Sequence, residues 1–393
     1  MRIAFFSDNL YPELSGIADT IVITGRELTK RGHTVCYVGP RYSKPDYDKN
    51  KQRFPSAEEQ ENIDGMPVVR LRSVRLPLSP TGQSRFAFPT GASFAFLKEF
   101  KPDIIHTQSA YGVGFEAKRA AKKFGVPLIG TNHTAIEDFF PFGTRAFMRY
   151  WDAHYYNHCD FVTAPYQALI ERMREVGFKK PGTAVANPVE LATFMPPSAE
   201  EKALLKQEFK LDGPVVLYVG RLGIEKCVDV VVRGFAELKK KFPTATLIAT
   251  GHGAAEPYLR ELADGLGVAN SMRFVGFLER DVLAKTYKAA DVFAFMSTSD
   301  SQSISLMQAY ATGMPAVCAR ARGLPDYTPP EAGFLVEPGD HMALADKLTK
   351  LLREDTLRHD MGTAAQAFVQ RFTPEKIAQK WEEIYRSAIE NKK

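Results

Sequence analysis

Short hydrophobic runs alternate with amphipathic segments through the first half of the chain. Residues 2–7 predict a strand, residues 8–16 a loop, and residues 18–31 a helix, in which Ile21 and Leu28 lie at helical spacing. Further strands are predicted at 33–38, 104–105, 127–131, 161–164 and 183–186, and a further helix at 116–124. Strands and helices in this order predict a parallel sheet with helices on both faces.

The alternation stops at residues 188–200, which contain three prolines and lack a clear period, and then starts again. The predicted strands of the second half are 215–219, 246–250, 272–275, 292–295 and 315–317, and the predicted helices are 228–241, 254–266, 280–289, 305–312 and 374–390. The pattern predicts an α/β protein with two doubly wound, Rossmann-like domains. Ligands of such folds bind beyond the carboxyl ends of the parallel strands.

Composition limits the class of protein. The 393 residues are 45% hydrophobic and 25% charged, as in soluble globular chains, and no run reaches the roughly 18 apolar residues of a membrane span. The apolar stretch within residues 1–6 is too short for a signal peptide, so a cytoplasmic location is expected. Four scattered cysteines, Cys36, Cys159, Cys227 and Cys318, predict buried thiols and no metal cluster.

Positive charge is concentrated in the first half. Residues 1–190 contain 25 Lys and Arg against 20 Asp and Glu, and residues 68–123 contain ten against three. This imbalance suggests an anionic partner such as a membrane surface or a phosphorylated substrate. A solvated, lysine-rich helix surface is the alternative. Nucleic acid is not expected, because no nucleic-acid motif accompanies the charge.

Two segments of the second half favour binding of a phosphorylated ligand. In Gly220-Arg221-Leu222-Gly223-Ile224-Glu225-Lys226, at a strand end, Arg221 and Lys226 could clamp a diphosphate. Residues 297–309 hold a serine-rich loop with Asp300 that leads into a helix start, where backbone amides favour an anion. An ordinary surface loop and a helix N-cap are the simpler interpretations. The P-loop, dinucleotide and nucleophile-elbow motifs are absent, which disfavours those enzyme classes.

Together these segments resemble the retaining glycosyltransferases of family four, which have the two-domain GT-B fold. The resemblance spans essentially the whole chain and rests on the order and spacing of several short motifs. They are Pro12 to Gly16, Arg31-Gly32-His33, Pro102-Asp103-Ile104-Ile105-His106, Gly130-Thr131-Asn132-His133-Thr134, Tyr218-Val219-Gly220-Arg221 with Glu225-Lys226, Phe274-Val275-Gly276-Phe277, Ala290-Asp291-Val292-Phe293 and Ala311-x-Gly313-x-Pro315.

The resemblance implies domains at 1–187 and 201–371, joined by a linker at 188–200. It also implies that residues 372–393 form a helix that crosses back to the first domain, which takes the acceptor. The second domain takes the nucleotide sugar.

The resemblance also implies roles for particular side chains. Arg221 and Lys226 would bind the donor diphosphate without a metal or cofactor, and His133 would lie beside the transferred sugar, although a strand-end histidine is often only structural. Gly16 would let its loop approach the phosphates and the acceptor. Asp300, with Ser303, Ile304 and Gln308, would complete the donor site.

The chain departs from the family pattern at that site. Asp300 and Gln308 replace the usual pair of glutamates, Ser301 and Ser303 stand where glycines are common, and Cys227 replaces a glycine. Gln308 can still exchange hydrogen bonds with a ribose, but it carries no charge.

We therefore expect transfer of a hexose from a nucleotide diphosphate sugar, with UDP favoured over GDP. The basic region with Phe86, Phe88, Phe94, Phe96 and Phe100 favours a lipid acceptor, such as diacylglycerol or a lipid-linked glycan, reached at the cytoplasmic membrane face. Alternatively, these rings are core, and the acceptor is a soluble sugar phosphate or a polysaccharide. A non-catalytic relative that binds nucleotide sugar, or an epimerase of the same fold, are further alternatives.

Overall fold

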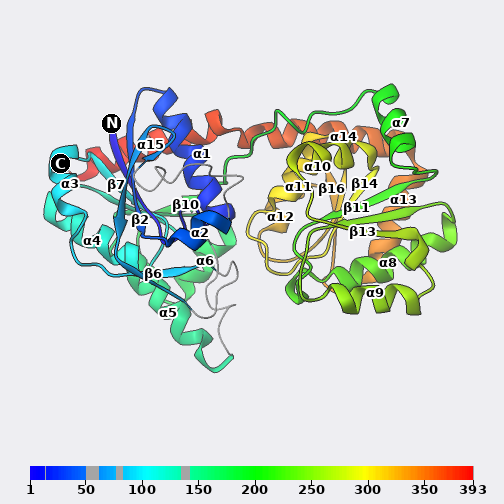
Figure 1. The fold of residues 1–393 in the computed structure, drawn as a ribbon, viewed down its shortest axis with the longest axis horizontal. Helices are drawn as coiled ribbons and strands as arrows, with labels where there is room; N and C mark the ends of the chain where they lie inside the picture. Colours follow the sequence, from blue (N-terminus) through cyan, green and yellow to red (C-terminus); the bar gives the residue numbers. More distant parts are fainter. Residues whose placement is uncertain (14, 50–61, 77–82, 134–141, 393) are drawn as a thin grey trace. The chain divides into compact units, whose positions relative to one another are not determined.

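The computed structural model describes residues 1–13, 15–49, 62–76, 83–133 and 142–392. The chain forms two compact units. The N-terminal unit contains Met1–Pro188 and Pro374–Lys393, and the C-terminal unit contains Val189–Thr373. Each unit has its own sheet with helices on both faces (Figure 1).

The N-terminal unit is built on an eight-stranded sheet of order β10-β9-β8-β7-β1-β2-β4-β3. Its strands are β1 (Arg2–Phe6), β2 (Thr34–Pro40), β3 (Asn62–Ile63), β4 (Met66–Leu71), β7 (Ile104–Thr107), β8 (Leu128–Thr131), β9 (Phe161–Ala164) and β10 (Gly182–Ala184). All pairs are parallel except β3 with β4. A separate antiparallel hairpin pairs β5 (Ser73–Arg75) with β6 (Arg85–Ala87).

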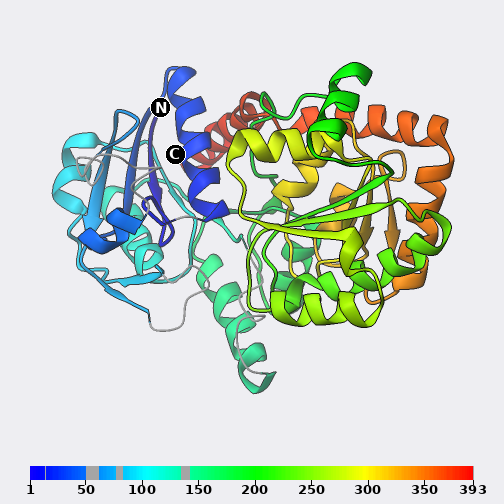
Figure 2. The ribbon, with the colours of Figure 1, turned by 45° about the vertical axis from the view of Figure 1, so that its right-hand side comes forward.

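The helices of this unit begin and end at residues suited to those places. The Ser15 hydroxyl accepts from the amide of Ala18 and caps the first helix, and Gly32, with φ of +87°, follows that helix in the left-handed conformation. The helices are α1 (Gly16–Lys30), α2 (Lys44–Lys49), α3 (Phe94–Phe100), α4 (Gly112–Phe124), α5 (Arg145–Tyr156), α6 (Gln167–Glu175) and α15 (Pro374–Lys392). Helix α5 extends away from the sheet of its unit (Figure 2).

Helix α15 is held in the N-terminal unit by a buried carboxylate. Glu382 accepts hydrogen bonds from Arg31 Nε (2.9 Å) and Nη2 (3.0 Å), and its Oε1 lies 2.8 Å from His33 Nε2. The hydrogen bonds from Arg31, more than those from His33, lower the pKa of Glu382 to about 2. The Arg31-Gly32-His33 segment therefore anchors the last helix of the chain.

The C-terminal unit has a six-stranded parallel sheet of order β13-β12-β11-β14-β15-β16. Its strands are β11 (Val215–Val219), β12 (Thr246–Thr250), β13 (Met272–Gly276), β14 (Val292–Phe295), β15 (Ala316–Ala319) and β16 (Gly333–Val336). Its helices are α7 (Ala199–Glu208), α8 (Val228–Lys241), α9 (Glu256–Gly265), α10 (Arg280–Ala289), α11 (Ile304–Ala311), α12 (Leu324–Tyr327), α13 (His341–Arg353) and α14 (Asp355–Val369).

The two doubly wound sheets confirm the predicted fold class, and several details differ from expectation. Helix α4 begins at Gly112 rather than at residue 116. Arg70, one of the ten basic residues in 68–123, is only partly exposed, and its guanidinium donates to the carbonyls of Tyr11 (2.6 Å) and Pro40 (3.3 Å). Burial lowers the pKa of Arg70. Cys227 is part-exposed, whereas Cys36, Cys159 and Cys318 are buried.

Among the described residues, no helix combines the length and the hydrophobicity that a membrane span requires.

Candidate active site

The loop after β11, which carries Arg221, is supported by the loop after β12. The amide of Leu222 donates to the carbonyl of His252 (3.0 Å), and the amide of Ala255 donates to the carbonyl of Leu222 (2.9 Å). A Cβ atom on Gly253 would lie only 2.2 Å from the Leu222 carbonyl oxygen, so a glycine is required at this close approach. The Gly251-His252-Gly253 segment thus supports the Arg221 loop by packing.

Lys226 ends a short 3₁₀ turn, Ile224–Lys226, and contacts the loop after β14. Its ammonium group donates to Asp300 Oδ2 at 2.7 Å and to Ser299 Oγ at 3.3 Å. The Ser297 hydroxyl also donates to Asp300 Oδ2. Most of the Lys226 and Asp300 side chains is shielded from solvent, which strengthens the attraction between them.

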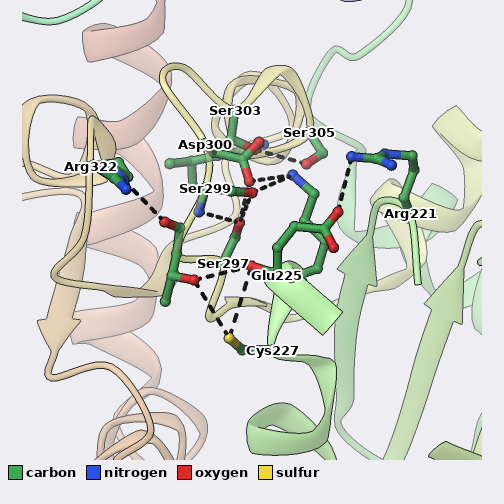
Figure 3. A network of polar contacts seen from close by, with 12 residues as sticks. Arg221, Glu225, Cys227, Ser297, Ser299, Asp300, Ser303, Ser305 and Arg322 are labelled. Atoms are coloured by element: carbon green, nitrogen blue, oxygen red, sulfur yellow. Dashed lines mark hydrogen bonds and ion pairs between the residues drawn. The ribbon is translucent and has the colours of Figure 1, made fainter. Parts of the chain in front are cut away.

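Arg221 pairs instead with Glu225, four residues later. The distance from Arg221 Nη2 to Glu225 Oε1 is 3.0 Å, and both side chains are exposed (Figure 3). Exposed ion pairs of this kind contribute at most about 1 kcal/mol. Both cations of the expected diphosphate clamp therefore have carboxylate partners, and the Arg221 pair is the weaker of the two.

The loops after β11, β14 and β15 are joined by backbone hydrogen bonds. The amide of Thr298 donates to the carbonyl of Glu225 (3.1 Å), and the amide of Gly323 donates to the carbonyl of Asp300 (3.1 Å). Since the strands are parallel, all three loops lie at the carboxyl edge of the sheet. The predicted residues Arg221, Lys226 and Asp300 therefore belong to one polar site.

Cys227 has a backbone conformation that favours glycine, the residue that is common at this position. Its φ is +48°, the left-handed conformation that costs most residues energy but costs glycine little. Its Sγ lies 3.8 Å from Thr298 Oγ1, and burial raises the pKa of the thiol.

The remaining predicted donor residues lie at the start of α11. The Ser303 hydroxyl caps the helix by accepting from the amide of Leu306 (3.2 Å) and lies 2.9 Å from Ser305 Oγ. Ile304 is the first helical residue. Gln308 Oε1 lies 3.2 Å from the Tyr287 hydroxyl, which also donates to the Ser305 carbonyl at 2.9 Å, so Tyr287 ties the Gln308 amide to the start of the helix.

His133 and Gly16 belong to the N-terminal unit. His133 directly follows β8 and is buried with its Nε2 2.6 Å from Gln108 Oε1. Burial lowers the pKa of His133 to about 4, so the ring is neutral at pH 7. Gly16 is the first residue of α1, and a Cβ atom there would meet nothing within 4 Å.

A hydrogen-bonded network extends from His133 to the last helix. Gln108 Nε2 lies 3.0 Å from His106 Nε2, and His106 Nδ1 lies 2.7 Å from the Tyr385 hydroxyl. In this orientation the Gln108 amide oxygen faces His133 and the amide nitrogen faces His106. His133 therefore carries its proton on Nε2, and His106 carries its proton on Nδ1. The Trp381 ring packs on the His106 ring, and the distance between their centroids is 4.5 Å. These residues hold the ring of His133 in one orientation.

From the sequence, no role was assigned to Glu225, Gln108 or Tyr385. The four-residue spacing of Arg221 and Glu225 could have indicated their ion pair. The contacts of Gln108 and Tyr385 join segments that are 25 and 279 residues apart, which no local pattern reveals. Among the residues that the structure describes, no group of three His, Cys, Asp or Glu side chains could hold a metal ion.

The fold of two Rossmann-like units is that of the GT-B class, and solved structures of glycosyltransferases share it over the length of the chain. Residues 14–193 match the family model described as Glycosyltransferase Family 4, and residues 200–368 match the model described as Glycosyl transferases group 1. The chain belongs to this family of retaining glycosyltransferases.

Its relatives act on different substrates, according to their names. The chain is 28% identical to an alpha-monoglucosyldiacylglycerol synthase of Streptococcus pneumoniae, over 81% of this chain and 70% of that one. It is 35% identical to the D-inositol 3-phosphate glycosyltransferase of Corynebacterium diphtheriae, over 99% and 95%. It is 26% identical to a GDP-mannose-dependent alpha-mannosyltransferase of Mycobacterium tuberculosis, over 90% and 89%.

A solved structure of Anabaena HepE in complex with UDP has the same fold, with a TM-score of 0.77 and 19% identity over 98% of this chain and 100% of that one.

Proposed function

We propose that this glycosyltransferase moves a hexose from a UDP-sugar to a membrane lipid, such as diacylglycerol or a lipid-linked glycan, with retention at the anomeric carbon. The observation that carries the donor half is the polar site of Arg221, Lys226 and Asp300 at the carboxyl edge of the C-terminal sheet. The name of the S. pneumoniae relative supports the acceptor half.

The donor diphosphate would exchange the existing ion pairs for new ones. Arg221 leaves the weak, exposed pair with Glu225 and offers its planar donors to one phosphate. Lys226 is already held at the site by Ser299 and Asp300, so little side-chain entropy is lost when it turns to the other phosphate. As the bond to the sugar breaks, negative charge grows on the leaving phosphate oxygen, and both cations stabilise it.

Asp300 would then be released toward the sugar. Its carboxylate accepts from Ser297 and Lys226, and the loss of one partner to the phosphates leaves capacity for a sugar hydroxyl. Gln308, which lies against the Tyr287 hydroxyl, and the capped start of α11 with Ser303 and Ile304 would meet the ribose and its neighbouring phosphate.

His133 would contact the transferred sugar from the N-terminal unit. A ring with a pKa of about 4 carries no charge during turnover, so it acts through hydrogen bonds and position rather than as a cation. Gly16, at the amino end of α1, would let that loop approach the phosphates and the acceptor.

A soluble, phosphorylated acceptor is the second candidate, because the relative named for D-inositol 3-phosphate covers nearly the whole chain at 35% identity. A GDP-sugar is the alternative donor, after the mannosyltransferase relative.

The test uses purified protein, labelled UDP-glucose, UDP-galactose or GDP-mannose, and vesicles that contain diacylglycerol, or inositol phosphate in their place. We expect label from a UDP-sugar in the organic phase. Label that stays in water-soluble products would replace the lipid acceptor by a soluble one, and turnover of GDP-mannose alone would overturn the donor.

A further inference from the structure

A pocket lined by three arginines lies in the N-terminal unit beside the β5–β6 hairpin, and His133, Gln108 and His106 are not among its lining residues. We propose that the pocket and the outer face of the hairpin dock on an anionic bilayer, with the arginines on phospholipid phosphates and the apolar face among the headgroups. This inference rests on the proposed function in one respect, because docking would give the enzyme access to its lipid acceptor.

The pocket has a volume of about 620 Å³ and is wide enough for a phosphate headgroup. Arg41, Arg72 and Arg85 line it, together with the hydroxyls of Ser43 and Ser73. Arg41 and Arg72 are exposed, and neither forms an ion pair with another residue that the structure describes.

The third arginine is fixed in place. Arg85 Nε donates to Ser73 Oγ (2.9 Å), and Arg85 Nη1 donates to Asp46 Oδ2 (3.0 Å). Its guanidinium also lies over the Tyr42 ring, 5.8 Å from the centroid. Asp46 offsets one of the three positive charges, so the pocket retains a positive charge that a phosphate group matches.

The outer face of the hairpin is apolar. Val74 pairs with Phe86 across the strands, and the Phe86 and Phe88 rings meet edge to face at 5.8 Å. Val74, Leu76, Phe86 and Phe88 are each between 36% and 49% exposed. Phe88 also lines the pocket, so the apolar face and the arginines are continuous. A row of exposed apolar side chains on a two-stranded sheet is typical of an interaction surface.

The other basic part of residues 68–123 is built differently. On α3 and α4, Lys123 Nζ and the Arg119 guanidinium lie 4.5 and 5.6 Å from the centroid of the Phe94 ring. Phe94 also packs edge to face on Phe124. The cations therefore cover that ring rather than flank an exposed apolar row. The combination of uncompensated arginines with exposed apolar side chains, which suits a bilayer interface, occurs on the hairpin.

The experiment is vesicle sedimentation of the full chain. Vesicles of phosphatidylcholine are compared with vesicles that also contain phosphatidylglycerol, at physiological salt. We expect binding to the anionic vesicles, and Arg41→Glu with Arg72→Glu should weaken it at least about 30-fold, since each basic residue near an anionic surface contributes about fivefold. Val74→Ser with Phe86→Ser should weaken binding about tenfold through lost apolar contact.

The matched control is Lys122→Glu with Lys123→Glu on α4, which makes the same change of charge on the same unit. Its binding should fall much less than that of the Arg41 and Arg72 variant. Equal losses in the two variants would replace the pocket by a general charge effect and overturn the proposal. Equal binding of wild-type protein to both kinds of vesicle would overturn it as well.

Inorganic phosphate and glycerol phosphate separate the bilayer from a free ligand. Protection of the wild-type fold by these anions, without any vesicle binding, would identify a site for soluble phosphate and contradict docking. Docking and the proposed acceptor also fail separately. Wild-type protein that binds anionic vesicles but transfers sugar only to water-soluble products keeps the docking surface and loses the lipid acceptor.

Discussion

The two units place polar side chains at their sheet edges in opposite electrostatic states. In the C-terminal unit, Lys226 and Asp300 are charged and paired, with Arg221 exposed beside them. In the N-terminal unit, His106 and His133 are buried, and burial lowers the pKa of both rings so that they are neutral. The first site is suited to an anionic ligand, and the second is suited to neutral hydroxyl groups.

This difference suggests a division of work within one reaction. Charges stabilise the leaving diphosphate, whereas a neutral ring held by Gln108 orients the sugar without adding a second charge.

Lys226→Met should lower kcat/KM by about 10²- to 10³-fold, because it removes a cation from the developing negative charge. It also leaves Asp300 without its 2.7 Å partner. Initial rates with labelled donor measure the effect. Arg221→Met is the matched control, and its loss should be about tenfold, because Arg221 is exposed and solvent screens its charge. A larger loss in the Arg221 variant would reverse the assigned order.

Glu382→Gln should lower the free energy of unfolding by about 2 kcal/mol, since it weakens hydrogen bonds from a charged guanidinium. The folded state lowers the pKa of Glu382 from 4.5 to about 2, so the carboxylate stabilises the fold fully above pH 4.5. That contribution is lost as the pH falls from 4.5 toward 2. Denaturant unfolding should show the full difference between variant and wild type at pH 7 and a smaller difference at pH 3, which lies below the unfolded pKa but above the folded one.

Tyr385→Phe should lower kcat about tenfold and leave KM for the donor unchanged, because it removes the hydroxyl that fixes His106 and, through Gln108, His133. Tyr385 acts as a positioning residue. The control is Tyr155→Phe, which also removes a buried hydroxyl, one that donates to the carbonyl of Gly114 (2.7 Å). The two variants should lose similar stability, and an equal loss of kcat in both would reduce Tyr385 to a structural role.

Cys227→Gly should raise the stability by about 1 kcal/mol, because glycine adopts the left-handed conformation at this position without strain. Thermal unfolding measures the gain. Cys318→Gly, in the buried strand β15, serves as the contrast and should be destabilising.

The sequence predicted the sheets because their strands are short apolar runs, and β9, β11, β12 and β14 begin and end at the predicted residues. Five strands were missed. The small strands β3, β5 and β6 have two or three residues of mixed polarity, which give no period, and β4 and β16 were not predicted either. In the donor site the motif predicted which residues take part. It did not predict their partners, because the Lys226–Asp300 pair joins loops 74 residues apart.

The measurement that tests the division of work most directly is the affinity for UDP of Lys226→Met and His133→Ala, titrated calorimetrically beside the wild type, with transfer rates taken on the same samples. We predict that the Lys226 variant loses UDP affinity about 100-fold, whereas the His133 variant binds UDP as the wild type does and yet loses transfer about 100-fold. Equal losses of UDP affinity in both variants, or normal UDP binding by the Lys226 variant, would contradict the account.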